Sequence, residues 1–229
     1  LASIVGDPEH LLVTRCGKYA DGGCIDEVRK VQLGHTSKTG ELVIAAPDGR
    51  SSLIADQHGN VRFALAWDKE SRSKLQVHRG SQEGWSVVND ASVSGVDSIP
   101  LGVDATGANA YLLTEREKGT TIVERYSIAD GKREQVYADP DVDPIWAIRS
   151  LDGSAVIGAY FDPTRPRAVL WDAAHPDVPA LRQILAAFPG KLVGITSASR
   201  DRNLAIVHVS ADDNPGEYYL FDRAARRAT

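Results

Sequence analysis

A turn followed by a strand recurs five times along the 229-residue chain at a nearly constant interval. Each turn is rich in Gly, Asp or Asn, and each run after it is apolar and rich in β-branched residues, which is typical of β-strands. The turns pivot at His10, Gly59, Gly107, Gly153 and Asn203, about 46 to 50 residues apart. Repeats of this length occur in propeller blades and other arrays of small units, so the repeat limits the fold more than any other feature.

The third repeat indicates what one unit contains. The segments "SIPLGV", "NAYLLTERE", "TTIVERYSI" and "KREQVYA" follow one another with short turns between them, which predicts four antiparallel strands in a meander. Four such strands make one blade of a β-propeller. We therefore predict an all-β chain, a β-propeller of four-stranded antiparallel blades with about five blades. The predicted blades cover residues 1–47, 51–90, 97–139, 143–189 and 191–229.

The fourth repeat departs from this pattern. Leu181, Ile184, Leu185 and Phe188 recur at helical spacing, and Pro189-Gly190 ends the run. This spacing predicts one short amphipathic helix near residues 178–188. The helix would replace or precede the outer strand of its blade and cover the edge of the sheet.

Both ends of the chain predict a longer parent polypeptide. The fifth repeat supplies three strands, and "RAARRAT" after them is interpreted as a turn toward a fourth strand that the sequence lacks. There is no Met, so Leu1 is expected to be an internal position. We expect an incomplete arc of a larger propeller. Its bare sheet edges would be covered by the rest of the parent protein or by a second copy in a homo-oligomer.

The composition excludes several partners. The net charge is −5 and the longest basic run is Arg226-Arg227, so nucleic acid is not expected to bind. No apolar run approaches the roughly 20 residues that cross a bilayer, and no signal-peptide pattern begins at Leu1. The compartment stays open between a cytoplasmic and a periplasmic or exported location.

Two cysteines, Cys16 and Cys24, flank the Gly-rich stretch "GKYADGG" between two strand-like runs. Their thiols could face each other across a hairpin. The pattern is compatible with a disulfide in an exported protein and with two free thiols, and both alternatives remain open.

The closing stretch "SADDNPGEYYLFDRAARR", residues 210–227, resembles the last propeller blade of prolyl oligopeptidase-family serine peptidases, especially the bacterial dipeptidyl or acylaminoacyl peptidase-like branch. In that family a D-x-P-G-x-Y-Y-L-F-D strand precedes the crossing into the catalytic domain. The stretch "FPGKLVGITSASRDRN" resembles the preceding blade entry, with Asp201-Arg202-Asn203 where the family often has an Asp-Gly turn. The resemblance extends over nearly the whole chain.

The resemblance implies a larger enzyme with an α/β-hydrolase domain downstream of Thr229 and further blades before Leu1. In such enzymes the propeller caps the active site, admits peptides and excludes folded proteins, and it supplies no catalytic residue. The resemblance therefore predicts a peptide substrate and an intramolecular hydrolase domain as partners, and it assigns no substrate-contacting residue in this chain. The alternative is a stand-alone propeller that acts as a protein-interaction module.

Motifs for chemistry are weak in this chain. The nucleophile elbow G-x-S-x-G does not occur, so no catalytic residue is predicted. The acidic run of residues 139–144 departs from a calcium loop, because Pro144 stands where Gly is needed and Ser150 where Glu is needed. It is interpreted as an inter-blade linker, and no metal or cofactor is predicted. Arg149, Arg165 and Arg167 lie near Asp162, where they could meet a carboxylate ligand at a propeller mouth or serve as solvated surface charges.

Overall fold

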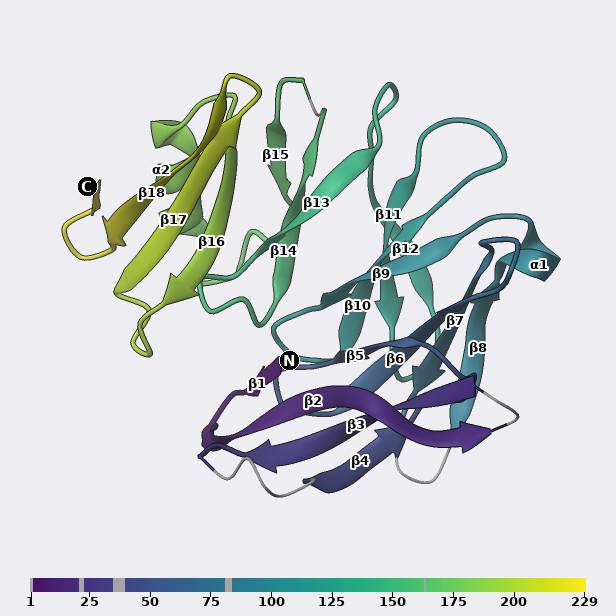
Figure 1. Ribbon diagram of the computed structural model, residues 1–229. Helices are drawn as coiled ribbons and strands as arrows, with labels where there is room; N and C mark the ends of the chain where they lie inside the picture. Colours follow the sequence, from purple (N-terminus) through teal and green to yellow (C-terminus); the bar gives the residue numbers. More distant parts are fainter. Residues whose placement is uncertain (1, 21–22, 35–39, 81–83, 163) are drawn as a thin grey trace. The chain divides into compact units, whose positions relative to one another are not determined.

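The computed structural model describes residues 2–20, 23–34, 40–80, 84–162 and 164–229. It contains five small antiparallel sheets that follow one another along the chain (Figure 1). The prediction of an all-β propeller fold with five blade-like sheets and one short helix near residue 180 is confirmed. No helix in these described ranges is both long enough and apolar enough to cross a membrane.

The strands of each sheet pair in sequence order, as a meander requires. The first sheet holds β1 (Ala2–Ile4), β2 (Asp7–Ala20), β3 (Gly23–Gln32) and β4 (Glu41–Ala45), and the second holds β5 (Ser52–Ala55), β6 (Val61–Trp67), β7 (Ser73–His78) and β8 (Trp85–Asp90). The third holds β9 (Ser98–Val103), β10 (Asn109–Thr114), β11 (Ile122–Ser127) and β12 (Arg133–Ala138), and the fourth holds β13 (Pro144–Arg149), β14 (Val156–Phe161) and β15 (Arg167–Leu170). The fifth holds β16 (Leu192–Ala198), β17 (Leu204–Ala211), β18 (Asn214–Asp222) and β19 (Arg227–Ala228).

The chain divides into two compact units. The first comprises residues 1–118 and 124–135, and the second comprises residues 119–123 and 136–229. The first unit thus contains the first two sheets and most of the third, and the second unit contains the fourth and fifth sheets with helix α2 (Val178–Ala187).

The turn that opens the second repeat is held by an acidic side chain and a residue of positive φ. The carboxylate of Asp56 accepts hydrogen bonds from the N–H groups of His58 and Asn60 at 2.9 and 3.0 Å, and Gly59 has a φ of 84°. Glycine adopts this left-handed conformation without steric cost, which explains its place in the turn.

Two of the predicted turn pivots are wrong. In the first repeat the turn residue of positive φ is Gly6, at 85°, and His10 lies inside strand β2. In the fifth repeat Arg202 adopts a φ of 58° in place of Asn203. The turn still closes there because Asp201 accepts hydrogen bonds from the backbone and side-chain amides of Asn203.

The first unit is held together by an apolar layer between the second and third sheets. Phe63 and Leu75 of the second sheet and Leu112 of the third have no exposed surface, and they belong to one cluster of buried side chains. The ring of Phe63 packs edge-to-face against Tyr126 with 6.0 Å between the centroids. Burial of these large side chains supplies most of the stabilisation that joins the two sheets.

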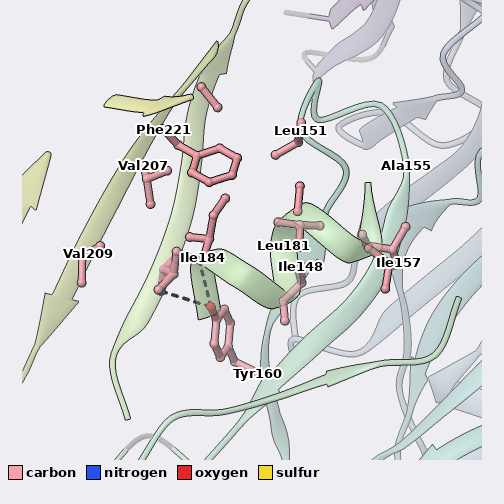
Figure 2. Close-up of a cluster of buried hydrophobic side chains, with 14 residues drawn as sticks. Ile148, Leu151, Ala155, Ile157, Tyr160, Leu181, Ile184, Val207, Val209 and Phe221 are labelled. Atoms are coloured by element: carbon pink, nitrogen blue, oxygen red, sulfur yellow. Dashed lines mark hydrogen bonds between the residues drawn. The ribbon is translucent and has the colours of Figure 1, made fainter. Parts of the chain in front are cut away.

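The second unit has a separate core between the fourth sheet, the fifth sheet and α2 (Figure 2). Leu181 and Ile184 of α2 are buried in it beside Phe221 of β18. The hydroxyl of Tyr160 lies within hydrogen-bond distance of both backbone groups of Val193: it donates to the C=O at 3.0 Å and accepts from the N–H at 3.2 Å. Burial raises the pKa of Tyr160 to about 12, so the phenol stays protonated and links the two sheets.

The fourth sheet has three strands in the described part of the chain, and α2 follows its last strand, as the helical spacing predicts. The fifth sheet corrects another prediction. The stretch "RAARRAT" contains a short fourth strand, β19, in which Arg227 and Ala228 pair with Asp222 and Phe221. Arg226 adopts a φ of 53° in the turn that leads into β19.

A second helix, α1 (Ala91–Ser94), was not predicted from the sequence. It is a single turn between the second and third sheets, too short to show helical spacing. The carboxylate of Asp90 accepts a hydrogen bond from the Ser92 N–H at its start, and Gly95 ends it with a φ of 77°.

The structure explains why a glycine stands at position 216 in the closing stretch. Its φ is 137°, and a Cβ atom at this position would overlap the imidazole ring of His208 on the neighbouring strand. His208 in turn packs against Tyr218, with ring centroids 4.8 Å apart. Only glycine allows β18 to pass this close to the histidine.

The start of β2 provides a test of pH dependence. Asp7 binds Lys30 Nζ at 2.6 Å and His10 Nδ1 at 2.7 Å, and these hydrogen bonds lower its pKa from 3.8 to about 2. Because the folded-state pKa lies below the unfolded one, Asp7 stabilises the fold above about pH 4, and this contribution is lost as the pH falls toward 2.

We expect Asp7→Asn to lower the urea midpoint at pH 7. Between pH 4 and pH 2 the urea midpoint of the variant should fall less than that of the parent protein. Asp213→Asn, on an exposed turn, serves as the control; an identical acid profile for the Asp7 variant would contradict the expectation.

Candidate functional site

The hairpin of β2 and β3 carries a disulfide between Cys16 and Cys24. The two Cα atoms are 5.5 Å apart. The strand register shifts between Cys16, which lies opposite Asp26, and Tyr19, which lies opposite Cys24. Residues 21 and 22 at the tip of the predicted hairpin lie outside the described residues. Of the two alternatives left open by the sequence, the structure contains the bridge.

An open hollow of about 680 Å³ lies beside this bridge in the first unit, and we call it the arginine groove. Its lining comes from the first sheet, the second sheet and the loop between them: Thr14, Arg15, Cys16, Asp26, Arg50, Ser51, Ser52, Leu53, Leu65 and Trp67. The groove therefore has an apolar part formed by two leucines and the indole of Trp67, and a polar part in which two arginines lie beside the Asp26 carboxylate and several hydroxyl groups.

One side of the arginine groove is organised by a buried carboxylate next to it in β3. Glu27 accepts hydrogen bonds from Arg29 Nε at 2.5 Å and from Arg15 Nε at 2.8 Å, both at the same oxygen. The bond to Arg29, then the bond to Arg15, lowers the pKa of Glu27 below its usual value. Glu27 thus holds the Nε of Arg15, whose side chain is 42% exposed and lines the groove.

The other side of the groove is organised by Asp26. Its carboxylate accepts a hydrogen bond from the Ser51 N–H at 2.9 Å and forms an ion pair with Arg50 Nε at 3.2 Å. The backbone of Asp26 also pairs with the loop, because its N–H donates to Gly49 C=O at 3.0 Å. These bonds fix the loop between the first and second sheets and leave Arg50 77% exposed.

The arrangement has the features of a surface that binds a ligand. Two guanidinium groups beside an exposed indole can hold a carboxylate and pack against an apolar side chain, which are the features of an acidic or C-terminal peptide segment. The groove contains Ser and Thr hydroxyls, but its lining includes no His to act as their base. Among the described residues, no cluster of His, Cys, Asp and Glu could hold a metal ion.

The arginines singled out in the sequence do not share one ligand position. Arg167 is engaged within the fold: it bonds Tyr137 Oη at 2.9 Å, pairs with Asp139 and lies over the ring of Phe161. The backbone N–H of Arg165 donates to Asp162 at 3.2 Å. Arg149 lines a different pocket, of about 130 Å³, which neither of the other two arginines lines.

The acidic run of residues 139–144 forms a loop with its own internal partners. The carboxylate of Asp139 accepts hydrogen bonds from the N–H groups of Asp141 and Val142 at 3.0 and 3.2 Å, and it also pairs with Arg167. The Asp143 carboxylate accepts a hydrogen bond from the Thr121 N–H at 2.7 Å. Both carboxylates thus tie the loop to neighbouring segments of the second unit.

Arg15, Arg50 and Trp67 are the groove residues that sequence reasoning missed. They come from β2, a loop and β6, and no local spacing connects them. Trp67 looks like part of a WD dipeptide with Asp68, yet the similar pair Trp171-Asp172 follows the third strand of its sheet whereas Trp67 ends the second. The position of Trp67 at the end of a predicted strand is a signal that could have pointed to the groove, and its 48% exposure is known only from the structure.

Known proteins resemble the chain over most of its length. No family model matches the sequence. Among curated proteins, dipeptidyl aminopeptidase BIII from Pseudoxanthomonas mexicana is 24% identical over 206 residues, which cover 89% of this chain and 29% of the relative. The chain therefore spans less than a third of that relative's length.

Solved structures show the fold. Prolyl oligopeptidase B from Galerina marginata, bound to a 25mer macrocyclization substrate, matches with a TM-score of 0.57 and 12% identity over 99% of this chain and 33% of its own. A puromycin-hydrolyzing peptidase from Mycobacterium tuberculosis matches with a TM-score of 0.53 and 12% identity, over 100% of this chain and 36% of its own. TolB from Acinetobacter baumannii matches with a TM-score of 0.51 and 9% identity, over 95% of this chain and 51% of its own.

These comparisons first indicate the fold class of the chain and then a resemblance within that class. The class is the β-propeller, which the successive blade-like sheets and the solved structures support alike. Within that class, the predicted resemblance to the propeller region of prolyl oligopeptidase-family peptidases is confirmed.

The disulfide leads to a testable expectation. Closing a loop of eight residues' separation is worth roughly 2–3 kcal/mol in the chain-entropy account, because it restricts the unfolded chain. We expect dithiothreitol to lower the urea midpoint of the parent protein. The Cys16→Ser/Cys24→Ser double variant should show this lowered midpoint both with and without dithiothreitol. A thiol titration of the denatured, unreduced protein that finds both cysteines free would contradict the bridge.

Proposed function

We propose that residues 1–229 are the non-catalytic propeller region of a prolyl oligopeptidase-like serine peptidase that acts on peptides. In this proposal an α/β-hydrolase domain elsewhere in the longer protein performs the hydrolysis, and the propeller governs which substrates are admitted. The observation that carries the proposal is the similarity to dipeptidyl aminopeptidase BIII over 89% of this chain but only 29% of the relative. The missing G-x-S-x-G motif supports the same division of labour.

The arginine groove is the surface through which we propose that the propeller contacts peptides. Arg15 and Arg50 would bind a carboxylate of the peptide, and Trp67 would pack against a neighbouring apolar side chain. Such a contact changes substrate binding and leaves the chemical step to the hydrolase domain.

A serine-directed fluorophosphonate tests the division of labour in the full-length protein. We expect one labelled serine, outside residues 1–229 and inside a G-x-S-x-G sequence, with an Asp and a His encoded after it. A label inside residues 1–229, a protein that takes up no label, or a reading frame that ends at Thr229 would each overturn the proposal.

The groove is tested by the kinetics of the same protein. Arg50→Glu should raise KM at least fivefold for peptides with an acidic residue and leave KM for neutral peptides unchanged within twofold, with kcat unaffected. Arg200→Glu, an exposed arginine in the second unit, is the matched control. If the two variants changed KM equally, the groove would have no specific role in substrate binding.

The second candidate is a stand-alone propeller that binds another protein. It is favoured by the likeness to TolB, which is not named as a peptidase. A protein that consists of these blades alone and takes up no fluorophosphonate would support this candidate against the first.

A further inference from the structure

Strand β15 is the last strand of the fourth sheet and has a partner on one side only (Figure 1). In the other four sheets a fourth strand occupies the corresponding place. After β15 the chain instead continues through a turn into α2, which packs into the core beside the fifth sheet. The fourth sheet therefore lacks its outer strand in the described part of the chain.

The register shows which backbone groups of β15 lie at this edge. Leu170 pairs with Gly158 and Ala168 with Tyr160, and the Trp171 N–H donates to Ile157 C=O at 3.1 Å. In an antiparallel pair the hydrogen-bonded positions alternate, so Val169 directs its N–H and C=O toward β14. Ala168 and Leu170 direct theirs toward the free edge, where no described residue bonds them.

A hollow of about 400 Å³ lies next to this edge, within the second unit. Its lining comes from β14, β15, α2 and the segment that follows the helix: Tyr160, Pro166, Ala168, Leu170, Arg182, Leu185, Ala186, Phe188, Gly190 and Lys191. Ala168 and Leu170 thus offer side chains to the hollow and backbone groups to the edge. A strand added to β15 would send every second side chain toward the hollow.

The charges around the hollow have one sign. Arg182 and Lys191 are the two basic residues of its lining, which contains no Asp or Glu. In the part of the chain that the structure describes, no carboxylate lies within ion-pair distance of either side chain. An occupant with a carboxylate on its inward face would therefore complement the hollow.

We propose that the free edge of β15 binds an extended acidic segment of a partner polypeptide by β-strand addition. The segment pairs its backbone with Ala168 and Leu170, and it places glutamate or aspartate side chains near Arg182 and Lys191 and an apolar side chain against Leu185 and Phe188. Backbone pairing provides affinity and the inward side chains provide selectivity, which is how sheet edges bind peptides. This edge lies in the second unit, and the binding is independent of the proposed peptidase activity.

The probe is a fluorescein-labelled, acetylated peptide Thr-Glu-Thr-Leu-Thr-Glu-Thr, added to the full-length protein after fluorophosphonate treatment so that no turnover interferes. We expect saturable binding by fluorescence anisotropy. Replacing both Glu by Lys, or methylating alternate backbone nitrogens of the peptide, should weaken binding at least tenfold. Equal binding of the N-methylated peptide would overturn strand addition.

Variants of the protein locate the binding. Ala168→Pro removes an edge N–H, and Arg182→Glu with Lys191→Glu reverses the charge of the hollow; each should raise the Kd at least tenfold. The charge reversal is on the surface and does not depend on whether Ala168→Pro folds. Arg200→Glu should leave the Kd within twofold. An unmodified protein that does not bind the peptide, or that forms dimers which the Ala168→Pro and charge-reversal variants abolish, would overturn the proposal.

Discussion

Replacing Phe63 by Ala is expected to lower the free energy of unfolding by about 3–5 kcal/mol. The side chain has no exposed surface and packs within the layer between the second and third sheets, against Tyr126 among others. Truncation removes the transfer free energy of the ring and leaves a cavity that the surrounding β-strands can close only in part. Urea unfolding followed by tryptophan fluorescence measures the loss.

Hydrogen exchange places that loss within the chain. Amides of the second and third sheets should exchange faster in the Phe63→Ala variant, because their protection depends on the shared layer. Val93→Ala, at a side chain that is 86% exposed, should change the free energy of unfolding by less than about 0.5 kcal/mol. A Phe63→Ala protein as stable as the Val93→Ala protein would show that the layer does not join the sheets.

The fold was predictable because its signals are local and repeat. The turn from Asp56 to Asn60 contains the acidic residue and the glycine that it needs, and an apolar strand follows it directly. A few consecutive residues are therefore enough to predict the start of a blade. Five repeats of one weak signal make a strong one. The errors fell where the local chemistry was irregular, at Gly6, at Arg202 and at the single helical turn that Asp90 caps.

The arginine groove was not predictable for the opposite reason. Arg15, Arg50 and Trp67 come together only through the pairing of two sheets, and each is ordinary in its own segment. The role of Asp26 and Glu27 in positioning the arginines depends on the same tertiary contacts. The disulfide lay between these extremes. The sequence predicted a hairpin that carries both cysteines, but not the register of its strands, which decides how close Cys16 and Cys24 come.

Asp177 shows how a buried charge can join blades that apolar packing also joins. Its side chain is 1% exposed and accepts hydrogen bonds from the Leu151 N–H and from Arg223 Nη1, both at 3.0 Å. Arg202 approaches the same carboxylate at 3.7 Å and pairs with Asp152 at 2.6 Å. Asp177 thus links a turn of the fourth sheet, the start of α2 and two turns of the fifth sheet.

Asp177→Ala is therefore expected to cost about 3 kcal/mol of unfolding free energy, at the lower end for removing one partner of a buried ion pair. The lower end applies because Arg202 and Arg223 are about one-third exposed and can be hydrated again. Asp177→Asn should cost less, since an amide oxygen can still accept from the Leu151 N–H. Asp213→Ala on the exposed turn between β17 and β18 is the control. If Asp177→Ala and Asp213→Ala shared one urea midpoint, the carboxylate would contribute nothing net, and the apolar core around Phe221 alone would hold the fourth and fifth sheets together.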